Sequence, residues 1–184
     1  MKPTEDLMNE HAAISIMLSI MKKIAENIKA GKGFNKAHVE KIVDFLQNFA
    51  DKCHHGKEER VLFPALEDAG ISRDNGPVGV MLYEHTIGRE YIAEMITALK
   101  KADQPDGNSP EELANAMYQY VNLLQNHIMK ENNILFPMAD KVLDDDLQEE
   151  LYIQFEKIED EIIGAGVHEQ YHKLIHEFEK IYLV

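Results

Sequence analysis

The feature that most constrains this chain is a short sequence that occurs twice. Residues 54–64 read HHGKEERVLFP, and residues 127–137 read HIMKENNILFP. Both copies begin with histidine, carry a glutamate four residues later and end in Leu-Phe-Pro. A Glu-His pair precedes each copy, at residues 10–11 and 84–85, and the two separations are nearly equal. The duplication predicts one helical hairpin used twice, with two histidines and one glutamate in each hairpin.

The hydrophobic pattern predicts helices along the whole chain. Apolar residues follow helical spacing over residues 4–30, and the histidine at position 11 lies on the same stripe. A second helix is expected to begin near Asn35, with Pro64 kinking or ending it. A third should begin at Pro77 and run to about Lys101, and a fourth should follow a break at residues 102–110. No segment alternates with the period of a strand over a useful length.

These helices predict an all-α fold. An antiparallel up-down four-helix bundle should occupy residues 1–142, with short connecting loops. A C-terminal extension, residues 143–184, should add two helices packed on the bundle. The first is an acidic helix over residues 144–161 and the second covers residues 167–182, with hinge glycines between them.

Helical periodicity also selects which motif residues face the core. Counting back by three and four positions from His54 meets apolar residues, whereas the same count from His55 meets polar ones. We therefore expect His54 and Glu58 to face inward. His55 and Glu59 are expected to point towards the edge of the bundle.

Composition limits the partners. The formal net charge is -14, which argues against unaided binding to nucleic acid or anionic membrane and fits a protein that attracts cations. No stretch approaches the apolar length of a membrane-spanning helix, and the N-terminus lacks a signal-peptide pattern. With a single cysteine, Cys53, no intrachain disulfide can form. These features predict a cytoplasmic protein.

The repeated motif brings metal-binding side chains together. A histidine and a glutamate four residues apart on a helix share one face, so both can reach one metal ion. A buried glutamate needs a cationic partner, and Lys57, Arg60 and Lys130 are expected to point away from this face. Imidazole with carboxylate suits iron, zinc, manganese or copper. Two divalent ions against two carboxylates would leave positive charge that favours a bound hydroxide, oxide or other small anion.

In order, spacing and helix placement, these residues resemble the hemerythrin-like proteins, the hemerythrin HHE cation-binding domain family. The resemblance spans residues 1–142 and includes both HxxxE motifs, both upstream histidines and both Leu-Phe-Pro sequences. It implies a four-helix bundle around two iron ions in an oxo- or hydroxo-bridged non-haem centre, with zinc able to substitute. The implied bridging ligands are Glu58 and Glu131, and the implied terminal ligands are His11, His54, His85 and His127.

The chain departs from the oxygen-carrying members of that family at one position. They have a second histidine one turn after the third-helix ligand, where this chain has Arg89. The iron nearest His85 is therefore expected to lack one protein ligand. This disfavours simple reversible oxygen carriage relative to sensing, peroxide or nitric oxide chemistry, or iron handling.

The last helix carries His168 and His172 in the sequence HEQYH, which matches the HExxH pattern of zinc metalloproteases. The pattern is short, and no third ligand with the expected spacing follows it. Two other uses are open. One or both histidines could complete the metal site that lacks a ligand at Arg89, or both could pack at a seam between helices.

The leading functional hypothesis is a module that binds or senses oxygen, nitric oxide or iron, acting as a homo-oligomer or through another protein. The expected ligand is a small diatomic molecule or peroxide. The alternative is a di-iron enzyme that acts on peroxide or nitric oxide, or an iron donor in iron–sulfur cluster repair. Further alternatives are a bundle with adventitious zinc and a metal-free bundle whose histidines and glutamates bond to one another. The sequence leaves open whether the protein is an enzyme.

Overall fold

The computed structural model describes residues 1–102, 109–164 and 166–184. Across these residues the chain is helical and contains no strand, which confirms the all-α fold class. Most of the break predicted at residues 102–110 lies outside the described residues.

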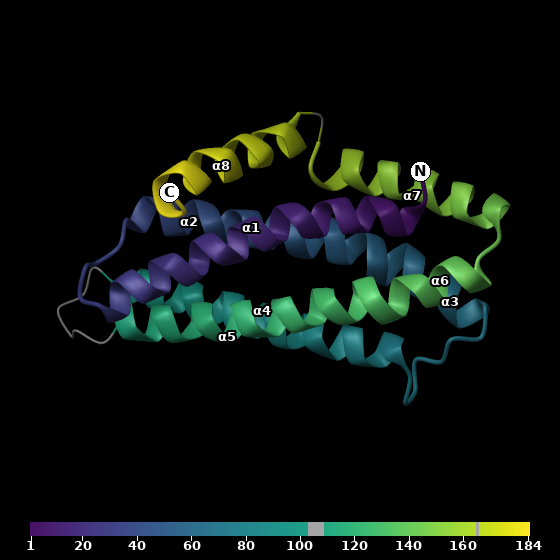
Figure 1. Cartoon of the computed structure of the whole chain (residues 1–184), viewed down its shortest axis with the longest axis horizontal. Coiled ribbons are helices and arrows are strands. Elements are labelled where there is room, and N and C mark those ends of the chain that lie inside the picture. Colours follow the sequence, from purple (N-terminus) through teal and green to yellow (C-terminus); the bar gives the residue numbers. More distant parts are fainter. Residues whose placement is uncertain (103–108, 165) are drawn as a thin grey trace.

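Four long helical runs lie side by side along the longest axis of the molecule (Figure 1). The first is α1 (Pro3–Lys29) and the third is α4 (Pro77–Lys101). The second joins α2 (Lys36–Phe45), the π-helices η1 (Leu46–His55) and η2 (Glu58–Leu62), and α3 (Phe63–Asp68). The fourth joins α5 (Ser109–Lys130), the π-helix η3 (Glu131–Leu135) and α6 (Phe136–Val142). The arrangement is consistent with the expected four-helix bundle, with α5 packed on both α1 and α4.

Local sequence signals set two of the helix starts. The Asn35 side chain caps α2 by accepting a hydrogen bond from the backbone N–H of His38. Pro77 is the first residue of α4, where the missing N–H has no helical partner to lose. Both starts agree with the sequence prediction.

The Leu-Phe-Pro ends of the two motifs coincide with π-helical turns. In the first copy the backbone N–H of Phe63 bonds to the carbonyl of Glu58, five residues earlier, and the second copy repeats this bond. A proline inside an α-helix removes a donor, and its ring collides with the carbonyl four residues earlier. A wider turn just before Pro64 makes room for the ring. The second run therefore continues to Asp68 and does not end at Pro64.

The first copy has one feature that the second lacks. The π-helix η1 covers Leu46–His55, whereas the matching residues of the second copy belong to the α-helix α5. A π-helix turns through a smaller angle per residue than an α-helix. Side chains at the end of η1 consequently face a different direction from the one that α-helical spacing predicts.

The C-terminal extension lies along the α1 and α2 side of the bundle (Figure 1). Its helices are α7 (Asp145–Ile162) and α8 (Val167–Tyr182), close to the predicted bounds. Between them, Gly164 and Gly166 have φ angles of 83° and 82°, a left-handed conformation that favours glycine.

Polar contacts and buried rings hold α8 on α2. The hydroxyl of Tyr171 donates to Asp44 over 2.9 Å, and the hydroxyl of Tyr182 lies 2.7 Å from Nδ1 of His38. Phe178, between these two tyrosines, is fully buried in the core. The extension is therefore part of the packed molecule.

Two apolar clusters fill the interior, and a layer of buried histidines separates them. In α1, His11 falls between Leu7 of one cluster and Ile14 of the other. His54, His85 and His127 likewise each fall between a residue of one cluster and a residue of the other. Apolar packing on both sides therefore shields this polar layer from water.

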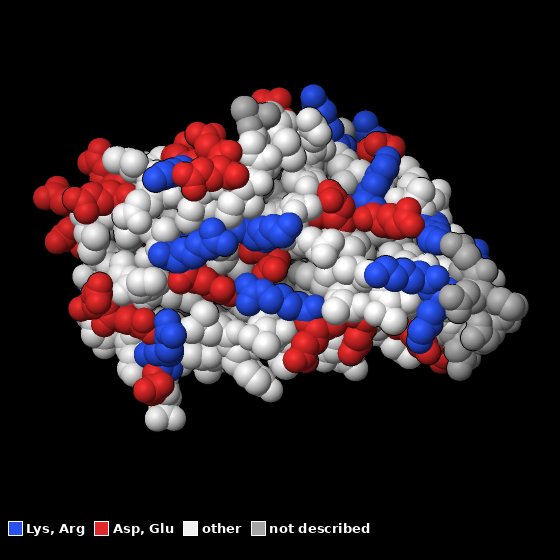
Figure 2. All heavy atoms as spheres, turned by 180° about the vertical axis from the view of Figure 1, so that it is seen from behind, with Lys and Arg blue, Asp and Glu red and all other residues white. Residues whose placement is uncertain are grey.

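The surface of the described residues is mixed in charge. On the face shown in Figure 2, Lys and Arg side chains lie among Asp and Glu side chains and do not form one continuous basic area. None of the described helices is long and apolar enough to cross a membrane.

Phe155 is the main apolar anchor of α7, because its ring is fully buried in the cluster that also contains Leu7. Phe155→Ala should lower the free energy of unfolding by about 3–5 kcal/mol, the usual cost of removing a buried aromatic ring. Ile153 on the same helix is 62% exposed. Ile153→Ala should therefore change the free energy by less than about 0.5 kcal/mol. Urea denaturation followed by circular dichroism measures both, and equal losses would contradict the docking of α7.

Candidate metal centre

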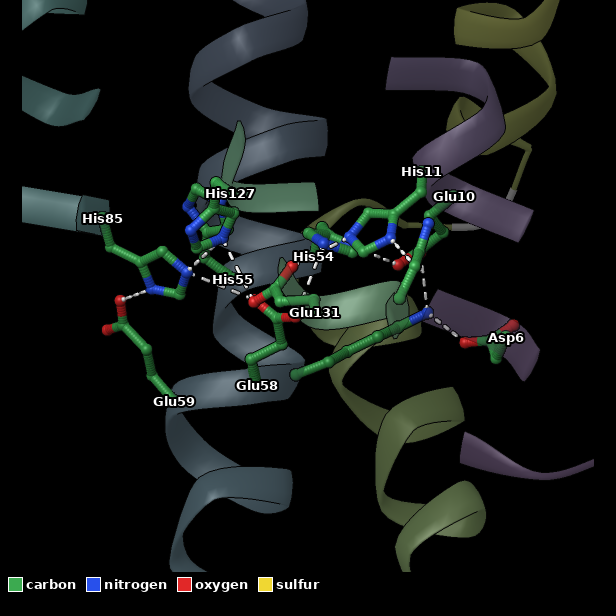
Figure 3. Close-up of polar contacts among 12 residues, drawn as sticks. Asp6, Glu10, His11, His54, His55, Glu58, Glu59, His85, His127 and Glu131 are labelled. Carbon is green, nitrogen blue, oxygen red and sulfur yellow. Dashed lines mark hydrogen bonds and ion pairs between the residues drawn. The ribbon is translucent and has the colours of Figure 1, made fainter. Parts of the chain in front are cut away.

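The structure brings the predicted histidines and glutamates together in one buried layer (Figure 3). No member of the set is more than 2% exposed, and each of the long helical runs contributes to it. The set consists of His11 from α1, His54 and Glu58 from the second run, His85 from α4, and His127 and Glu131 from the fourth run.

His55 also belongs to this layer, so the prediction that it points to the edge is wrong. Its side chain is buried, and its ring stacks on that of His85 with the centroids 3.8 Å apart. The prediction assumed α-helical spacing, but His55 is the last residue of the π-helix η1. The smaller rotation per residue turns both His54 and His55 inward. Glu59, by contrast, does lie at the border of the site and is 26% exposed.

The ligand atoms form two clusters, each compact enough to hold one metal ion. The three-histidine cluster contains His55, Glu58, His85 and His127. The two-histidine cluster contains His11, His54, Glu58 and Glu131. Within each cluster the candidate ligand atoms lie within 4.8 Å of one another. His55 thus supplies the imidazole that was expected to be missing beside His85, and it comes from a different helix than the one carrying Arg89.

The two glutamates lie between the clusters. Glu58 places Oε1 3.7 Å from Nε2 of His54 and Oε2 3.4 Å from Nε2 of His85. Glu131 places Oε2 3.1 Å from Nε2 of His11 and Oε1 3.1 Å from Nε2 of His127. Each carboxylate therefore directs one oxygen to each cluster, which is the placement that a bridging ligand requires.

The duplication extends to the residues that orient the histidines. Glu10 contacts Nδ1 of His54 at 2.8 Å, and Glu84 contacts Nδ1 of His127 at 2.9 Å. We call Glu10 and Glu84 outer carboxylates, because they contact the far side of the imidazoles from Glu58 and Glu131. In each copy the lysine that precedes Glu58 or Glu131 donates to the outer carboxylate: Lys57 to Glu10 and Lys130 to Glu84. The sequence contained this signal, because Glu-His and Lys-Glu occur in both copies, yet only the histidines and the inward glutamates were assigned a role.

The other three histidines also have side-chain partners at Nδ1, two carboxylates and one amide. Nδ1 of His85 lies 2.7 Å from Glu59, and Nδ1 of His55 lies 3.3 Å from Asp51. Nδ1 of His11 lies 2.8 Å from the side-chain oxygen of Asn132. Ionised carboxylate oxygens and amide oxygens accept hydrogen bonds and donate none, so these contacts place a proton on Nδ1. The lone pair of Nε2 then points to the inward side, where Nε2 of His85 lies 3.1 Å from Nε2 of His127.

Arg89 keeps the carboxylates of Asp51 and Glu59 ionised. Burial alone would raise the pKa of Asp51, but hydrogen bonds from His55 and Arg89 lower it to about 2. Burial would likewise raise the pKa of Glu59, but hydrogen bonds from His85 and Arg89 lower it to about 2. Both groups are therefore acceptors throughout the neutral range.

The inward atoms lack the partners that buried polar groups normally have. The oxygens of Glu58 accept no hydrogen bond from a described residue, and Nε2 of His55 is likewise unpartnered. The oxygens of Glu131 face Nε2 of His11 and of His127 at 3.1 Å each, and these contacts are ion pairs when the imidazoles carry a proton on Nε2. Burial, followed by repulsion from Glu131, raises the pKa of Glu58 to about 7. Leaving such atoms unpaired is costly. A pair of cations would satisfy all of them, so the residues present fit a dinuclear metal site.

Without a metal, the same residues can pair only in part. Burial alone would lower the pKa of His127, but Glu131 raises it to about 10. A protonated His127 can therefore pair with Glu131 in the metal-free protein. Glu58 makes no hydrogen bond of this kind, and its imidazole contacts are longer, at 3.4 Å to His85 and 3.7 Å to His54.

Lys57 points away from the face that carries Glu58, as predicted, but it is buried against other carboxylates. Its side chain is fully buried, and its ammonium group donates to Asp6, Glu10 and Glu159 at 2.9, 2.8 and 3.1 Å. These carboxylates raise its pKa above the ordinary value, although burial acts in the opposite sense. Because Glu159 belongs to α7, Lys57 connects the C-terminal extension to the carboxylate that orients His54.

His168 and His172 lie outside both clusters. Their rings pack against Phe49, with centroids 5.3 and 6.4 Å from it, so they occupy a seam between α8 and the second run. His168 comes near Glu10 and Glu159, where Lys57 already provides the positive charge. Of the two uses left open by the sequence, this packing corresponds to the seam between helices.

Comparison with known families agrees with this geometry. Residues 2–139 match the hemerythrin HHE cation binding domain. The chain belongs to that family. The matched range contains both clusters and ends before α7.

Individual relatives are similar over part of their length. The iron-sulfur cluster repair protein YtfE of Edwardsiella ictaluri (strain 93-146) is 32% identical over 124 residues, which cover 66% of this chain and 56% of that protein. YtfE of Cronobacter sakazakii (strain ATCC BAA-894) is 37% identical over 92 residues, 47% of this chain and 40% of its own. The uncharacterized protein Rv1995 of Mycobacterium tuberculosis (strain ATCC 25618 / H37Rv) is 26% identical over 139 residues, 76% of this chain and 54% of its own. The chain spans about half the length of the curated relatives it matches.

The unpaired carboxylate of Glu58 should make the metal-free protein sensitive to pH. Its pKa is about 7 in the folded chain against an ordinary value of 4.5. A raised pKa contributes stability that is present below the unfolded value and is lost as pH rises through the folded value. The free energy of unfolding should therefore fall by on the order of 3 kcal/mol between pH 4.5 and 7.5, relative to Glu58→Gln.

Urea denaturation of the chelator-treated protein across that range measures this difference. Glu40, an exposed residue of α2, provides the matched control. Glu40→Gln should leave the pH dependence of the wild type unchanged. A Glu58→Gln variant that follows the wild-type curve would show that the carboxylate is not unpaired.

Proposed function

We propose that the chain holds two iron ions in a non-haem dinuclear centre and uses it to bind or sense a small molecule such as oxygen or nitric oxide. The observation that carries the proposal is the pair of buried carboxylates, Glu58 and Glu131, each of which directs one oxygen to each histidine cluster. Membership of a cation-binding family supports a metal at this position. Zinc is the main competing ion, because imidazole and carboxylate suit it as well.

The residues would divide between the ions as the clusters do. His55, His85 and His127 would bind one ion and His11 and His54 the other, with Glu58 and Glu131 bridging both. When bound, a di-iron centre supplies one-electron chemistry and a coordination position for a small ligand. The protein's own contribution is to fix the imidazole Nε2 atoms and to keep water out of the layer.

The two-histidine cluster is the expected place for the external ligand. It offers one imidazole fewer than the three-histidine cluster, so its ion would have more room for another donor. His11 in this cluster stacks on the buried ring of Phe136, at 5.5 Å between centroids, and follows the fully buried Leu7 along α1. Such close apolar surroundings favour a diatomic molecule or peroxide over a larger substrate. A sensor of this kind would act as a homo-oligomer or through a partner protein.

Iron content and spectrum test the centre. Anaerobic reconstitution with ferrous ion should load about two irons per wild-type chain, and air should then produce near-ultraviolet charge-transfer bands. His55→Ala should retain about one iron after gel filtration, because the three-histidine cluster loses an imidazole. His172→Ala, which changes a histidine outside both clusters, should retain two. A wild-type protein that stays colourless, or a His55→Ala variant with full iron content, would contradict the assignment.

A second candidate function is iron delivery for the repair of iron–sulfur clusters. It is supported by the relatives named iron-sulfur cluster repair protein, which this chain matches over about half their length. Iron-loaded protein should then rebuild the cluster of an iron-depleted ferredoxin, with sulfide present, faster than free ferrous ion at equal concentration. Recovery of the ferredoxin spectrum measures the rate. A rate no higher than that of free iron, together with reversible nitric oxide binding, would favour the binding module.

Catalysis is a separate outcome. A di-iron enzyme would consume many equivalents of peroxide or nitric oxide per chain. A binding module would instead saturate at about one equivalent of ligand per chain. Counting equivalents consumed by the iron-loaded protein separates the two.

A further inference from the structure

The two clusters differ in how their histidines are held. Every histidine of the three-histidine cluster has a carboxylate at Nδ1: Asp51 for His55, Glu59 for His85 and Glu84 for His127. In the two-histidine cluster, His54 has the carboxylate of Glu10, whereas His11 has only the amide oxygen of Asn132. The repeat supplies the contrast directly, because Glu59 and Asn132 occupy the same position in the two copies.

One guanidinium group holds two of those carboxylates. Arg89 donates from Nε to Oδ1 of Asp51 at 2.8 Å and from Nη2 to Oε1 of Glu59 at 2.7 Å. These are the same oxygens that face Nδ1 of His55 and of His85. Arg89 therefore links the second run to α4 and fixes two imidazoles of one cluster at once.

The other half of the molecule has no equivalent of this clamp at the matching position. Arg89 lies four residues after His85, and the residue four after His11 is Ser15, whose side chain is exposed. Without Arg89, the partly exposed carboxylates of Asp51 and Glu59 could turn towards water, since they are 21% and 26% exposed. The planar fork of arginine suits this task, because it can bond to two acceptors in fixed directions.

We propose that Arg89 is a positioning residue that makes the three-histidine cluster the tighter of the two cation sites. The proposal rests on the dinuclear centre proposed above and assigns its two halves different affinities. A carboxylate at Nδ1 makes Nε2 of the imidazole a more basic metal ligand and holds the ring in the orientation that binds the ion. The cluster with three such imidazoles and the Arg89 clamp should fill first, and the ion beside His11 and His54 should be the first to leave.

Stepwise metal binding by the full chain tests this. Metal-free protein is titrated anaerobically with Co²⁺, followed by its visible absorption and by calorimetry. The wild type should bind two ions in two steps. Arg89→Ala should weaken the first step by roughly tenfold and leave the second within twofold, because outer partners of metal ligands typically contribute 10–100-fold to affinity. Arg89→Lys should give an intermediate loss, since one ammonium group cannot hold both carboxylates in the same directions.

Two control variants make the result specific. Arg60, an exposed arginine on η2, should be replaceable by alanine without effect on either step. Asn132→Ala, which removes the partner of His11, should weaken the second step only. Thermal melts of every metal-free variant show whether the fold is intact.

A spectroscopic readout identifies the cluster that fills first. At one equivalent of Co²⁺, the wild type should show three shifted imidazole N–H proton signals, from His55, His85 and His127. In Arg89→Ala, signals from the two-histidine cluster should appear at the same ratio. An unchanged first step, or an equal loss in both steps, would overturn the role of Arg89. A wild-type protein that binds no second ion would instead refute the dinuclear centre itself.

Discussion

The structure depends on two buried carboxylates whose charge the surrounding side chains compensate only in part. Glu58 and Glu131 lie in a polar layer between two apolar clusters. The oxygens of Glu58 accept no hydrogen bond from a described residue, whereas those of Glu131 face the imidazoles of His11 and His127. Burial of charge on this scale is tolerated only when a cation or a proton compensates it. The surrounding imidazoles can do so in part, and two metal ions could do so fully. This requirement explains why so many titratable groups converge on one level of the bundle.

An outer set of carboxylates organises the histidines around that pair. Glu10 and Glu84 repeat the same contact in the two halves, each supported by a lysine, so the duplication includes the orienting residues as well as the inward ones. The two halves differ in what else they join. Lys57 also reaches Glu159 of α7, which ties the C-terminal extension to the orientation of His54.

The two copies of the motif differ, so the two halves of the site are not equivalent. The π-helix η1 exists only in the first copy, and it adds His55 to one side of the layer. Arg89 stands where oxygen-carrying family members have a histidine, yet it joins Asp51 and Glu59 and so supports His55 and His85. Because His55 adds an imidazole beside His85, the absence of a histidine at position 89 does not by itself disfavour reversible oxygen binding. A pair of unequal cation sites fits ligand binding at one ion and also fits release of that ion.

The sequence by itself determined the helices, the duplication and the six inward residues of the two HxxxE hairpins. These follow from α-helical spacing and from a motif that occurs twice. The matching order of His54 and Glu58 with His127 and Glu131 identified the candidate metal ligands. Only the tertiary structure decided the position of His55 and of Lys57. The prediction of which side chains face inward assumes a constant rotation per residue. The π-helix η1 rotates less at each residue, and only the first copy of the motif contains it. The burial of Lys57 depends on carboxylates from α1 and α7, which are distant in the chain and meet only when the helices pack.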